Sequence, residues 1–229
     1  VDAGGGNGIL TQLENAGVSL SDIHNMFITH AHTDHILGAI WIVRMVIQRM
    51  KKGEYNGTFT IYSHDKALKV LESVCHMTLP EKDLSFLGKS IFLKEVKDSD
   101  MFCIDNIKFQ CFDILSTKEK QFGFCAQLAN GIKVACLGDE PYNVENADWL
   151  LCEAFCLYEE RDIFKPYEKH HSTALEAGIL ANKLNVKNLL LYHTEDKNLK
   201  TRKSSYSKEA SQYFQGNVFV PNDLEIIHF

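Results

Sequence analysis

The stretch His30-Ala31-His32-Thr33-Asp34-His35 places four metal-binding side chains within six positions. Imidazole nitrogen and carboxylate oxygen are ligands that a borderline divalent ion such as zinc prefers. In an extended segment His30, His32 and Asp34 point to one side, because strand side chains alternate, while His35 points elsewhere. The stretch therefore suits two adjacent ions better than a single one. The alternative, a polar loop that is rich in histidine by chance, is disfavoured because three of the chain's ten histidines fall here.

Apolar segments flank this cluster on both sides. Residues 25–29 are mostly apolar and predict a short strand that ends at the ligands. Residues 36–50 are largely apolar and free of proline, which predicts a mostly buried helix that ends at the basic residues 49–52 and Gly53. A ligand cluster between the end of a strand and the start of a helix is held by two rigid elements, as a catalytic ion requires.

With these residues in view, the chain resembles the metallo-β-lactamase superfamily, whose signature His-x-His-x-Asp-His is matched in full at 30–35. Within the superfamily it is most similar to the ribonuclease Z-like branch, and the resemblance covers nearly all of the 229 residues. The first signature is highly specific, whereas the later motifs are short and convince by their order along the chain. They are the aspartate and glycine turn at 1–8, Leu137-Gly138-Asp139, Glu153-Ala154-Phe155, His171-Ser172-Thr173 and residues 189–193.

The resemblance implies a role for each matched residue. It implies that Asp139 bridges two metal ions and that Asp2 accepts hydrogen bonds behind the ligands. We expect Asp34 and His171 to be catalytic: Asp34 or Asp139 would orient a water molecule and accept its proton, and His171 would donate a proton to the leaving oxygen. His171 alone fits His-x-Thr, so the adjacent His170 is expected to be structural. The metal ligands implied are His30, His32, Asp34, His35, Asp139 and His193.

One departure from the family pattern concerns the second metal position. The family places a further metal-binding histidine before the bridging aspartate, but this chain has no histidine from Met77 to Lys169. Residues 115–117 occupy the corresponding place, and Cys111 or Asp113 is an open alternative as a substitute ligand. We therefore predict one or two Zn²⁺ ions (or Mn²⁺ or another divalent transition metal), of which one is bound more weakly.

The remaining chain alternates strand-like and helix-like segments with short connections. This arrangement fits an α/β fold with two packed sheets and helices outside, the four-layer αββα sandwich of the metallo-β-lactamase type. We expect a single domain over residues 1–229, and the resemblance implies that the family's first strands are missing from this N-terminally truncated sequence. Predicted strands are 58–63, 91–96, 101–104, 107–114, 122–128, 132–137, 149–152, 188–192, 217–220 and 224–228, and predicted helices are 65–76, 173–184 and 207–214.

The composition limits the class of protein. The net charge is −6, without a long lysine or arginine cluster, which argues mildly against binding through many phosphates. Arg44 and Arg49 interrupt the only long apolar run, so we predict no transmembrane helix and no membrane partner. The seven cysteines form no Cys-x-x-Cys pair and predict a reducing, cytoplasmic location. Four of them are expected to be small buried side chains: Cys103, Cys111, Cys125 and Cys136.

These observations predict a metal-dependent hydrolase, most of all a phosphodiesterase similar to ribonuclease Z. That family captures tRNA with a protruding arm rich in glycine, proline and lysine, and residues 51–57 are too short to form one. A small phosphodiester such as a cyclic nucleotide is therefore competitive with RNA as the substrate, and a homodimer is left open. Two alternatives remain: hydrolysis of a small ester, thioester or lactone, and a non-catalytic relative with a degenerate metal site.

Overall fold

Residues 1–229 are all described by the computed structural model, in which the chain divides into two units. Unit 1 comprises residues 1–97 and 119–122, and unit 2 comprises residues 98–118 and 123–229. Each unit has its own sheet and its own hydrophobic core, and each is described by itself. The single domain over residues 1–229 stays a prediction.

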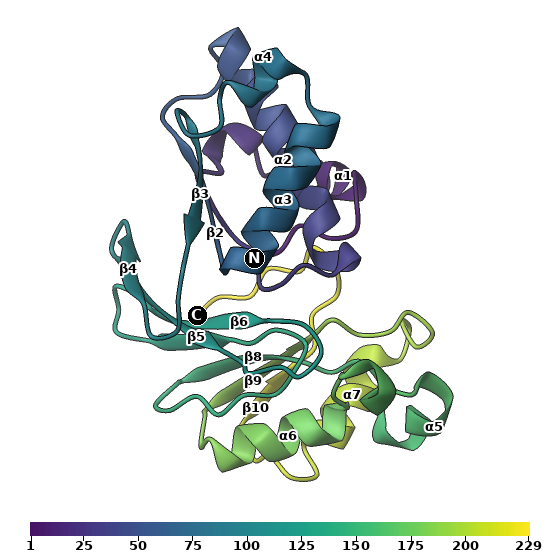
Figure 1. Cartoon of the computed structure of the whole chain (residues 1–229). Coiled ribbons are helices and arrows are strands. Elements are labelled where there is room, and N and C mark those ends of the chain that lie inside the picture. Colours follow the sequence, from purple (N-terminus) through teal and green to yellow (C-terminus); the bar gives the residue numbers. More distant parts are fainter. The chain divides into compact units, whose positions relative to one another are not determined.

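Unit 1 is built on a parallel sheet of three strands in the order β1-β2-β3 (Figure 1). The long helices α2 and α3 pack against each other, and their apolar residues share one core with the sheet. The elements in chain order are α1 (Gly8–Asn15), the 3₁₀ helix η1 (Leu20–Asp22), β1 (Asn25–Phe27), α2 (Thr33–Lys52), β2 (Phe59–Ser63), α3 (Asp65–Thr78), α4 (Glu81–Leu84) and β3 (Ile91–Glu95).

Helix α2 starts at the predicted ligand cluster. Its buried residues include Ile36, Ala39, Val43 and Ile47, which recur at three- and four-residue spacing and so form one apolar face. The helix ends at Gly53, whose φ of 72° belongs to the left-handed region that glycine adopts at little cost. The predicted helix over 36–50 is confirmed, but it begins at Thr33. The cluster is therefore extended only as far as the N-cap, and its last two ligand residues lie in the first helical turn.

Gly38 allows the N-terminal turn to lie directly against α2. The amide of Gly38 donates a hydrogen bond to the carbonyl oxygen of Gly4 at 2.8 Å, and the amide of Ala3 donates to the carbonyl oxygen of His35 at 2.8 Å. A Cβ atom at position 38 would lie 1.8 Å from the carbonyl oxygen of Ala3, so only glycine fits without a backbone shift. This close approach brings Asp2 beside the first turn of α2.

Unit 2 is built on a mixed sheet of seven strands in the order β10-β9-β8-β7-β6-β5-β4. Strands β7 to β10 are parallel neighbours, so their carboxyl ends meet at one edge of the sheet. Glu153 ends β8 at this edge, and Asp139 and His193 follow β7 and β9. The elements are β4 (Met101–Ile104), β5 (Ile107–Asp113), β6 (Phe122–Gln127), β7 (Lys133–Cys136), β8 (Trp149–Glu153), the 3₁₀ helix η2 (Tyr158–Glu160), α5 (Arg161–Phe164), the 3₁₀ helix η3 (Tyr167–Lys169), α6 (Ala174–Lys183), β9 (Asn188–Tyr192), α7 (Arg202–Ala210) and β10 (Asn217–Phe219).

Helices α6 and α7 lie side by side below the strands β8, β9 and β10 in Figure 1. Thr173 begins α6 with a capping box, because its side chain accepts from the amide of Glu176 and the Glu176 carboxylate accepts from the amide of Thr173. Gly178 permits the close packing of α7, since a Cβ atom there would lie 2.4 Å from the carbonyl oxygen of Ala210. Residues 171–173 therefore lead directly into a helix that is capped at its start and packed closely against α7.

Two sequence expectations about the elements were wrong, and one helix was not predicted. The strand predicted over 224–228 is not formed; Leu224 has a φ of 66°, which breaks an extended run. The helix predicted over 207–214 spans Arg202–Ala210 instead, and α1, which follows the glycine-rich turn, was not predicted. Among the cysteines, Cys111 and Cys136 are buried as expected, whereas Cys125 is partly buried and Cys103 is exposed. None of the helices is both long and apolar enough to cross a membrane.

Candidate metal and catalytic site

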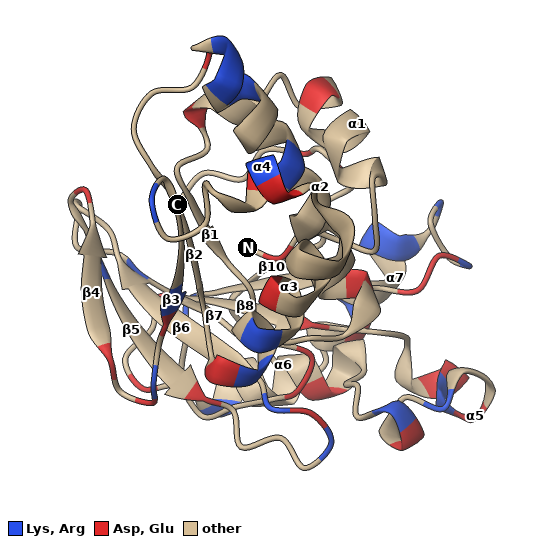
Figure 2. Cartoon of the chain, turned by 45° about the horizontal axis from the view of Figure 1, so that its top comes forward, with Lys and Arg blue, Asp and Glu red and all other residues tan.

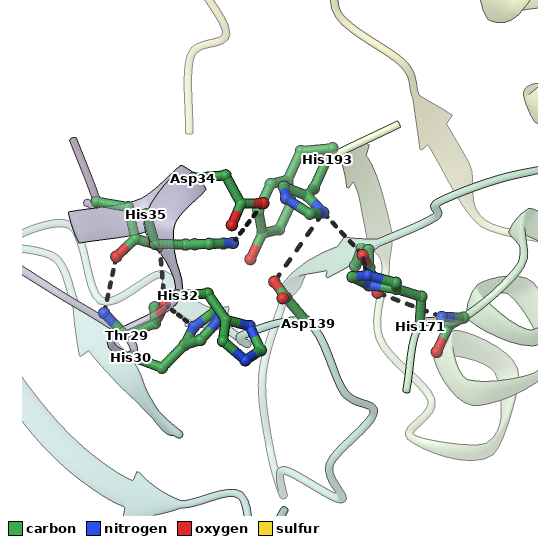
Figure 3. A network of polar contacts seen from close by, with 12 residues as sticks. Thr29, His30, His32, Asp34, His35, Asp139, His171 and His193 are labelled. Carbon is green, nitrogen blue, oxygen red and sulfur yellow. Dashed lines mark hydrogen bonds and ion pairs between the residues drawn. The ribbon is translucent and has the colours of Figure 1, made fainter. Parts of the chain in front are cut away.

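In unit 1 the carboxylate of Asp2 sets the tautomer of His30 through Thr29. Thr29 and His30 lie side by side in Figure 3. The amide of Thr29 donates to Oδ1 of Asp2 at 2.8 Å, and the hydroxyl of Thr29 donates to Oδ2 at 2.8 Å. Because a hydroxyl has only one hydrogen, its oxygen must accept from Nδ1 of His30, which lies 2.9 Å away. We therefore assign the Nδ1–H tautomer to His30, which leaves the lone pair on Nε2 for a metal ion.

His35 is oriented by the same carboxylate. Its Nδ1 lies 2.9 Å from Oδ2 of Asp2, which can only accept, so Nδ1 carries the proton and Nε2 keeps its lone pair. Oδ2 of Asp34 lies 3.6 Å from that Nε2 atom. His35 is buried and the Asp34 side chain is 60% exposed, so one side chain of this pair is shielded from solvent and the other is exposed to it. The expectation that Asp2 accepts hydrogen bonds behind the ligands is confirmed.

His30 and His32 form a second pair of donors. Nε2 of His30 and Nδ1 of His32 face each other at 2.9 Å. Two ligands at about 2.0–2.1 Å from one tetrahedral zinc ion are roughly 3.4 Å apart, so the spacings within both pairs of unit 1 come close to that of a shared ion. The imidazole and carboxylate donors of unit 1 therefore fit a zinc-class ion.

In unit 2 the buried carboxylate of Glu153 lies close to two imidazoles. They belong to His171 and His193, both labelled in Figure 3. The Oε1 atom of Glu153 lies 2.5 Å from Nδ1 of His171 and 2.8 Å from Nδ1 of His193. Its Oε2 atom accepts from the amide of Ser172 at 3.2 Å. Since a carboxylate only accepts, Nδ1 of His193 donates to Oε1 and the lone pair of that ring lies on Nε2. Nδ1 of His171 lies at ion-pair distance from the same oxygen but without the geometry of a hydrogen bond.

Asp139 completes a compact group in unit 2. One ligand atom each from Asp139, Glu153, His171 and His193 lies within 4.8 Å of the others. Asp139 is 2% exposed, and its Oδ1 atom lies 4.0 Å from Nδ1 of His193. Because Glu153 is already engaged by two imidazoles, it acts as a positioning residue. Asp139 and His193 remain as the donors that fit a divalent ion.

Hydrogen bonds hold the residues that follow His193 in place. His193 itself adopts a φ of 54°, a left-handed conformation that is uncommon outside glycine. The buried guanidinium of Arg202 donates from Nη1 to Oγ1 of Thr194 at 2.8 Å, and from Nη2 to the carbonyl oxygen of Pro221 at 3.3 Å. The amide of Glu195 donates to the carbonyl oxygen of Phe155, just after β8, at 2.8 Å. These bonds keep His193 on Glu153 in spite of its strained backbone.

In the segment that lacks the family histidine, neither Cys111 nor Asp113 belongs to a group of potential metal ligands. Cys111 is fully buried, and burial raises the pKa of its thiol to about 12, so it stays protonated at neutral pH. Asp113 uses its Oδ1 atom to accept from the amide of Leu115 at 2.8 Å. Ser116 instead donates a short hydrogen bond to the carboxylate of Glu140, the residue after Asp139.

Two histidines outside the predicted site have different surroundings. His76 is exposed, whereas His64 is buried as the N-cap of α3, where its Nδ1 accepts from the amide of Ala67 at 3.4 Å. Burial, and then the nearby Lys120, lowers the pKa of His64 to about 4. Neither residue joins a ligand group.

Sequence reasoning missed the residues that orient the ligands. Thr29 and Arg202 were not singled out, and Glu153 was taken only as a landmark at a strand end. The contact between Glu153 and His193 joins residues 40 positions apart, and no local pattern encodes it. An acidic residue at the end of a buried strand is the one signal that could have suggested Glu153.

Comparison with known proteins gives a family. The family model described as Anti-Pycsar protein Apyc1 matches residues 1–217. The chain is 26% identical over 270 residues to Ribonuclease Z of Protochlamydia amoebophila (strain UWE25), which covers 96% of this chain and 84% of that protein. It is 27% identical over 260 residues to Ribonuclease Z of Archaeoglobus fulgidus, which covers 90% of this chain and 78% of that protein.

Solved structures agree on the fold. The metallo-β-lactamase fold protein YhfI from Bacillus subtilis matches with a TM-score of 0.75 at 18% identity, over 96% of this chain and 83% of that one. Human tRNase Z, short form, matches with a TM-score of 0.71 at 20% identity, over 99% of this chain and 86% of that one. The chain therefore has the α/β metallo-β-lactamase fold and belongs to the family described as Anti-Pycsar protein Apyc1, within the ribonuclease Z-like branch of the superfamily.

Proposed function

We propose that this protein is a phosphodiesterase that works in the manner of ribonuclease Z. Its membership of the superfamily makes it a metal-dependent hydrolase, and the two sequence relatives named Ribonuclease Z support a phosphodiester substrate. The observation that carries the proposal is the carboxylate oxygen of Glu153, which lies 2.5 Å from His171 and 2.8 Å from His193. One buried group thereby prepares one histidine for proton transfer and the other for metal binding.

The donor sets described above suit Zn²⁺ first, with Mn²⁺ or another divalent transition metal as an alternative. When bound, such an ion lowers the pKa of its water toward neutrality and polarises a phosphoryl oxygen. Because no histidine occurs from Met77 to Lys169, we expect one position to be held more tightly than the other. The residues proposed to hold the ions are His30, His32, Asp34, His35, Asp139 and His193.

Two side chains are proposed to transfer protons, one as an acceptor and one as a donor. The exposed carboxylate of Asp34 is available to orient the attacking water and to accept its proton. His171 keeps Nδ1 on Glu153, so Nε2 is the atom that carries a proton to the leaving oxygen. The ring of Phe155 stacks on His171 at 4.6 Å with an interplanar angle of 17°, which further fixes the direction of Nε2.

The charge pattern favours a small phosphodiester, such as a cyclic nucleotide, over a long RNA. Lysine and arginine are interspersed with aspartate and glutamate along both units in Figure 2, without a continuous basic strip. Several lysines are also neutralised in ion pairs, such as Lys66 with Glu119 and Lys187 with Asp148. Binding through many phosphates needs unpaired cations along one face. A compact substrate needs few of them.

A substrate panel tests the proposal. The purified protein is reconstituted with Zn²⁺ or Mn²⁺ and assayed on bis(4-nitrophenyl) phosphate, cyclic nucleotides, short RNA, thioesters and lactones. We expect hydrolysis of the phosphodiesters that disappears with a chelator and returns with the metal. Turnover of thioesters or lactones alone would replace the proposal by an ester hydrolase, and no turnover on any substrate would support a non-catalytic relative.

A further inference from the structure

The direction of the His171 ring depends on the segments that surround it. Nδ1 of His171 lies 2.5 Å from Oε1 of Glu153, but without the geometry of a hydrogen bond. The ring stacks on Phe155 at 4.6 Å with an interplanar angle of 17°. The orientation of this histidine is therefore set by the backbone that carries it and by the backbone that carries Phe155.

These two segments run side by side beyond the edge of the sheet. The amide of Phe155 donates to the carbonyl oxygen of Ser172 at 2.8 Å. The amide of Ala174 donates to the carbonyl oxygen of Cys156 at 3.0 Å, and Cys156 forms an isolated parallel bridge with Thr173. Such a short pair of extended segments is marginally stable by itself, so it needs support from another element.

The carboxylate of Glu209 on α7 supports the end of this pair. Both of its oxygens accept from the amide of Tyr158, Oε1 at 2.9 Å and Oε2 at 3.0 Å. Oε2 also accepts from the amide of Leu175 at 2.9 Å. These amides belong to the first turns of η2 and α6, so they have no acceptor within their own helices. One carboxylate thereby fastens both segments to α7.

The surroundings of Glu209 are unfavourable for a carboxylate. Burial raises the pKa of its carboxyl group, and the hydrogen bonds from the amides of Tyr158 and Leu175 lower it in part. The carboxylates of Glu159 and Glu160 on η2 raise this pKa further. A partly buried carboxylate near two others is costly unless it is hydrogen-bonded, so its bonds to the two amides account for its place.

The other end of α7 acts on the segment of His193. Arg202 begins the helix and donates to Oγ1 of Thr194 at 2.8 Å. Between the two ends Tyr206 is fully buried, and its hydroxyl donates to the carbonyl oxygen of Phe155 at 3.3 Å. Residues 202, 206 and 209 recur at four- and three-residue spacing, so one face of α7 carries all three contacts.

We propose that α7 is a positioning helix whose two ends serve different histidines. Glu209 orients His171 for proton transfer, and Arg202 orients His193 for metal binding. The inference rests on the proposed function and deepens it, because it assigns the support of the two steps to separate residues outside the site. A helix with a merely structural role would affect both steps alike when either residue is replaced.

Two diaryl phosphodiesters that differ in their leaving group test the role of Glu209. Bis(4-nitrophenyl) phosphate has a good leaving group, whereas diphenyl phosphate has a poor one that needs a proton. Glu209→Met keeps the length of the side chain and removes both acceptors. We expect kcat on diphenyl phosphate to fall roughly 10-fold further than on bis(4-nitrophenyl) phosphate, with metal per chain unchanged. Glu209→Gln keeps one oxygen for both amides and should restore most of this loss.

Arg202→Met should show the opposite pattern. Without its bonds, the segment after His193 is no longer held, so metal binding should weaken roughly 10-fold or more in a chelator competition assay. At saturating metal the ratio of the two esters should match the wild type. Arg202→Lys keeps a cation and should bind metal more tightly than Arg202→Met.

Matched variants separate these effects from a general loss of charge. Glu168→Met and Lys203→Met replace an exposed acid and an exposed cation, and both should behave like the wild type in metal binding and in the ratio of the esters. An unchanged ratio in Glu209→Met, or the same pattern in Glu209→Met and Arg202→Met, would overturn the proposal.

Failure of the proposed function would look different. If the wild type cleaves neither ester, the phosphodiesterase assignment falls, and α7 is judged by metal binding and amide hydrogen exchange. The proposal then requires that Glu209→Met speeds exchange in residues 155–158 and 172–175 without loss of metal. It also requires that Arg202→Met weakens metal binding and speeds exchange in residues 193–196. Changes that are the same in both variants, or absent from both, would overturn it.

Discussion

A histidine binds a metal or moves a proton only through the ring nitrogen that its other hydrogen bonds leave free. In unit 1 Nδ1 of His35 donates to Asp2, and in unit 2 Nδ1 of His193 donates to Glu153, while Nδ1 of His171 lies 2.5 Å from the same Glu153 oxygen. At the scale of single residues, two carboxylates thus determine which ring nitrogens can take part in chemistry. Proton transfer and metal binding by the two histidines of unit 2 should therefore be separable by mutation.

His171→Ala should retain metal and lose turnover. Nδ1 of His171 lies 2.5 Å from Oε1 of Glu153 and its ring stacks on Phe155, so the proposed proton donor has a fixed orientation. We expect kcat to fall roughly 10²–10⁴-fold, the usual contribution of a general acid. The loss should shrink for nitrophenyl esters, whose leaving group needs little protonation. Loss of metal from this variant, or equal slowing of good and poor leaving groups, would remove His171 from the proton-donor role.

Glu153→Gln should weaken metal binding and turnover together. An amide can donate as well as accept, so it no longer imposes the Nδ1–H tautomer on His171 and His193. We expect roughly 10- to 100-fold weaker metal binding in a chelator competition assay. The exposed Glu159→Gln serves as the control and should bind metal like the wild type. Unchanged metal affinity of Glu153→Gln would show that the carboxylate does not orient the ligands.

Sequence reasoning reached the ligands but not their partners. The spacing of His30, His32, Asp34 and His35 predicts a metal site because four donors of the right chemistry fall together. The role of Asp2 followed from the family resemblance. The contact of Glu153 with His193 could not be predicted from the sequence, because it arises only when two neighbouring strands end at one sheet edge.

At the scale of elements, the ends of helices and strands determine where the reactive side chains stand. The predicted strand at 25–29 and helix at 36–50 are both present, since hydrophobic periodicity marks them clearly. Their boundaries were less predictable: α2 begins early enough to include Asp34 in its first turn. Close backbone approaches such as that at Gly38 leave no trace in periodicity.

Gly38→Ala should destabilise unit 1. The new Cβ atom would lie 1.8 Å from the carbonyl oxygen of Ala3, and a backbone carbonyl cannot rotate away as a side chain can. We expect a loss of about 3 kcal/mol in the free energy of unfolding, the upper range for over-packed sites. Gly8→Ala is the matched control, because its Cβ atom would meet nothing within 4 Å and alanine favours the helix. Equal stability of the two variants by denaturant unfolding would contradict the close packing.

His64 should make stability fall as the pH is lowered. Burial lowers the pKa of His64 to about 4 in the folded protein, against an ordinary value of 6.5, so the unfolded chain binds the proton first. The contribution is complete above pH 6.5 and is lost progressively between pH 6.5 and 4, by about 3 kcal/mol.

The variant His64→Asn keeps an acceptor for the amide of Ala67 and cannot titrate. Its denaturation midpoint should therefore depend less on pH than that of the wild type between pH 6.5 and 4. The exposed His76→Asn is the control and should keep the wild-type slope. An identical slope in the wild type and His64→Asn would show that folding does not shift the pKa of His64.

At the scale of the whole chain, the order of the motifs was sufficient to predict the superfamily and the α/β fold. The strand predicted at 224–228 failed because it begins within a turn at 223–224 and has no neighbouring strand to pair with. The proposed ligands come from two distant stretches of the sequence: residues 30–35, and Asp139 with His193. A metal-dependent hydrolase that uses both sets must fail when either set is broken.

The measurement that tests this claim most directly compares His193→Ala with His76→Ala. Nδ1 of His193 lies 2.8 Å from Oε1 of Glu153, which places the lone pair of the ring on Nε2, whereas His76 is an exposed residue of α3. Metal per chain and kcat/KM on bis(4-nitrophenyl) phosphate are determined for both variants and for the wild type. We expect His193→Ala to lose both metal and activity, although residues 30–35 are intact, and His76→Ala to lose neither. Full metal content and activity in His193→Ala would contradict the account.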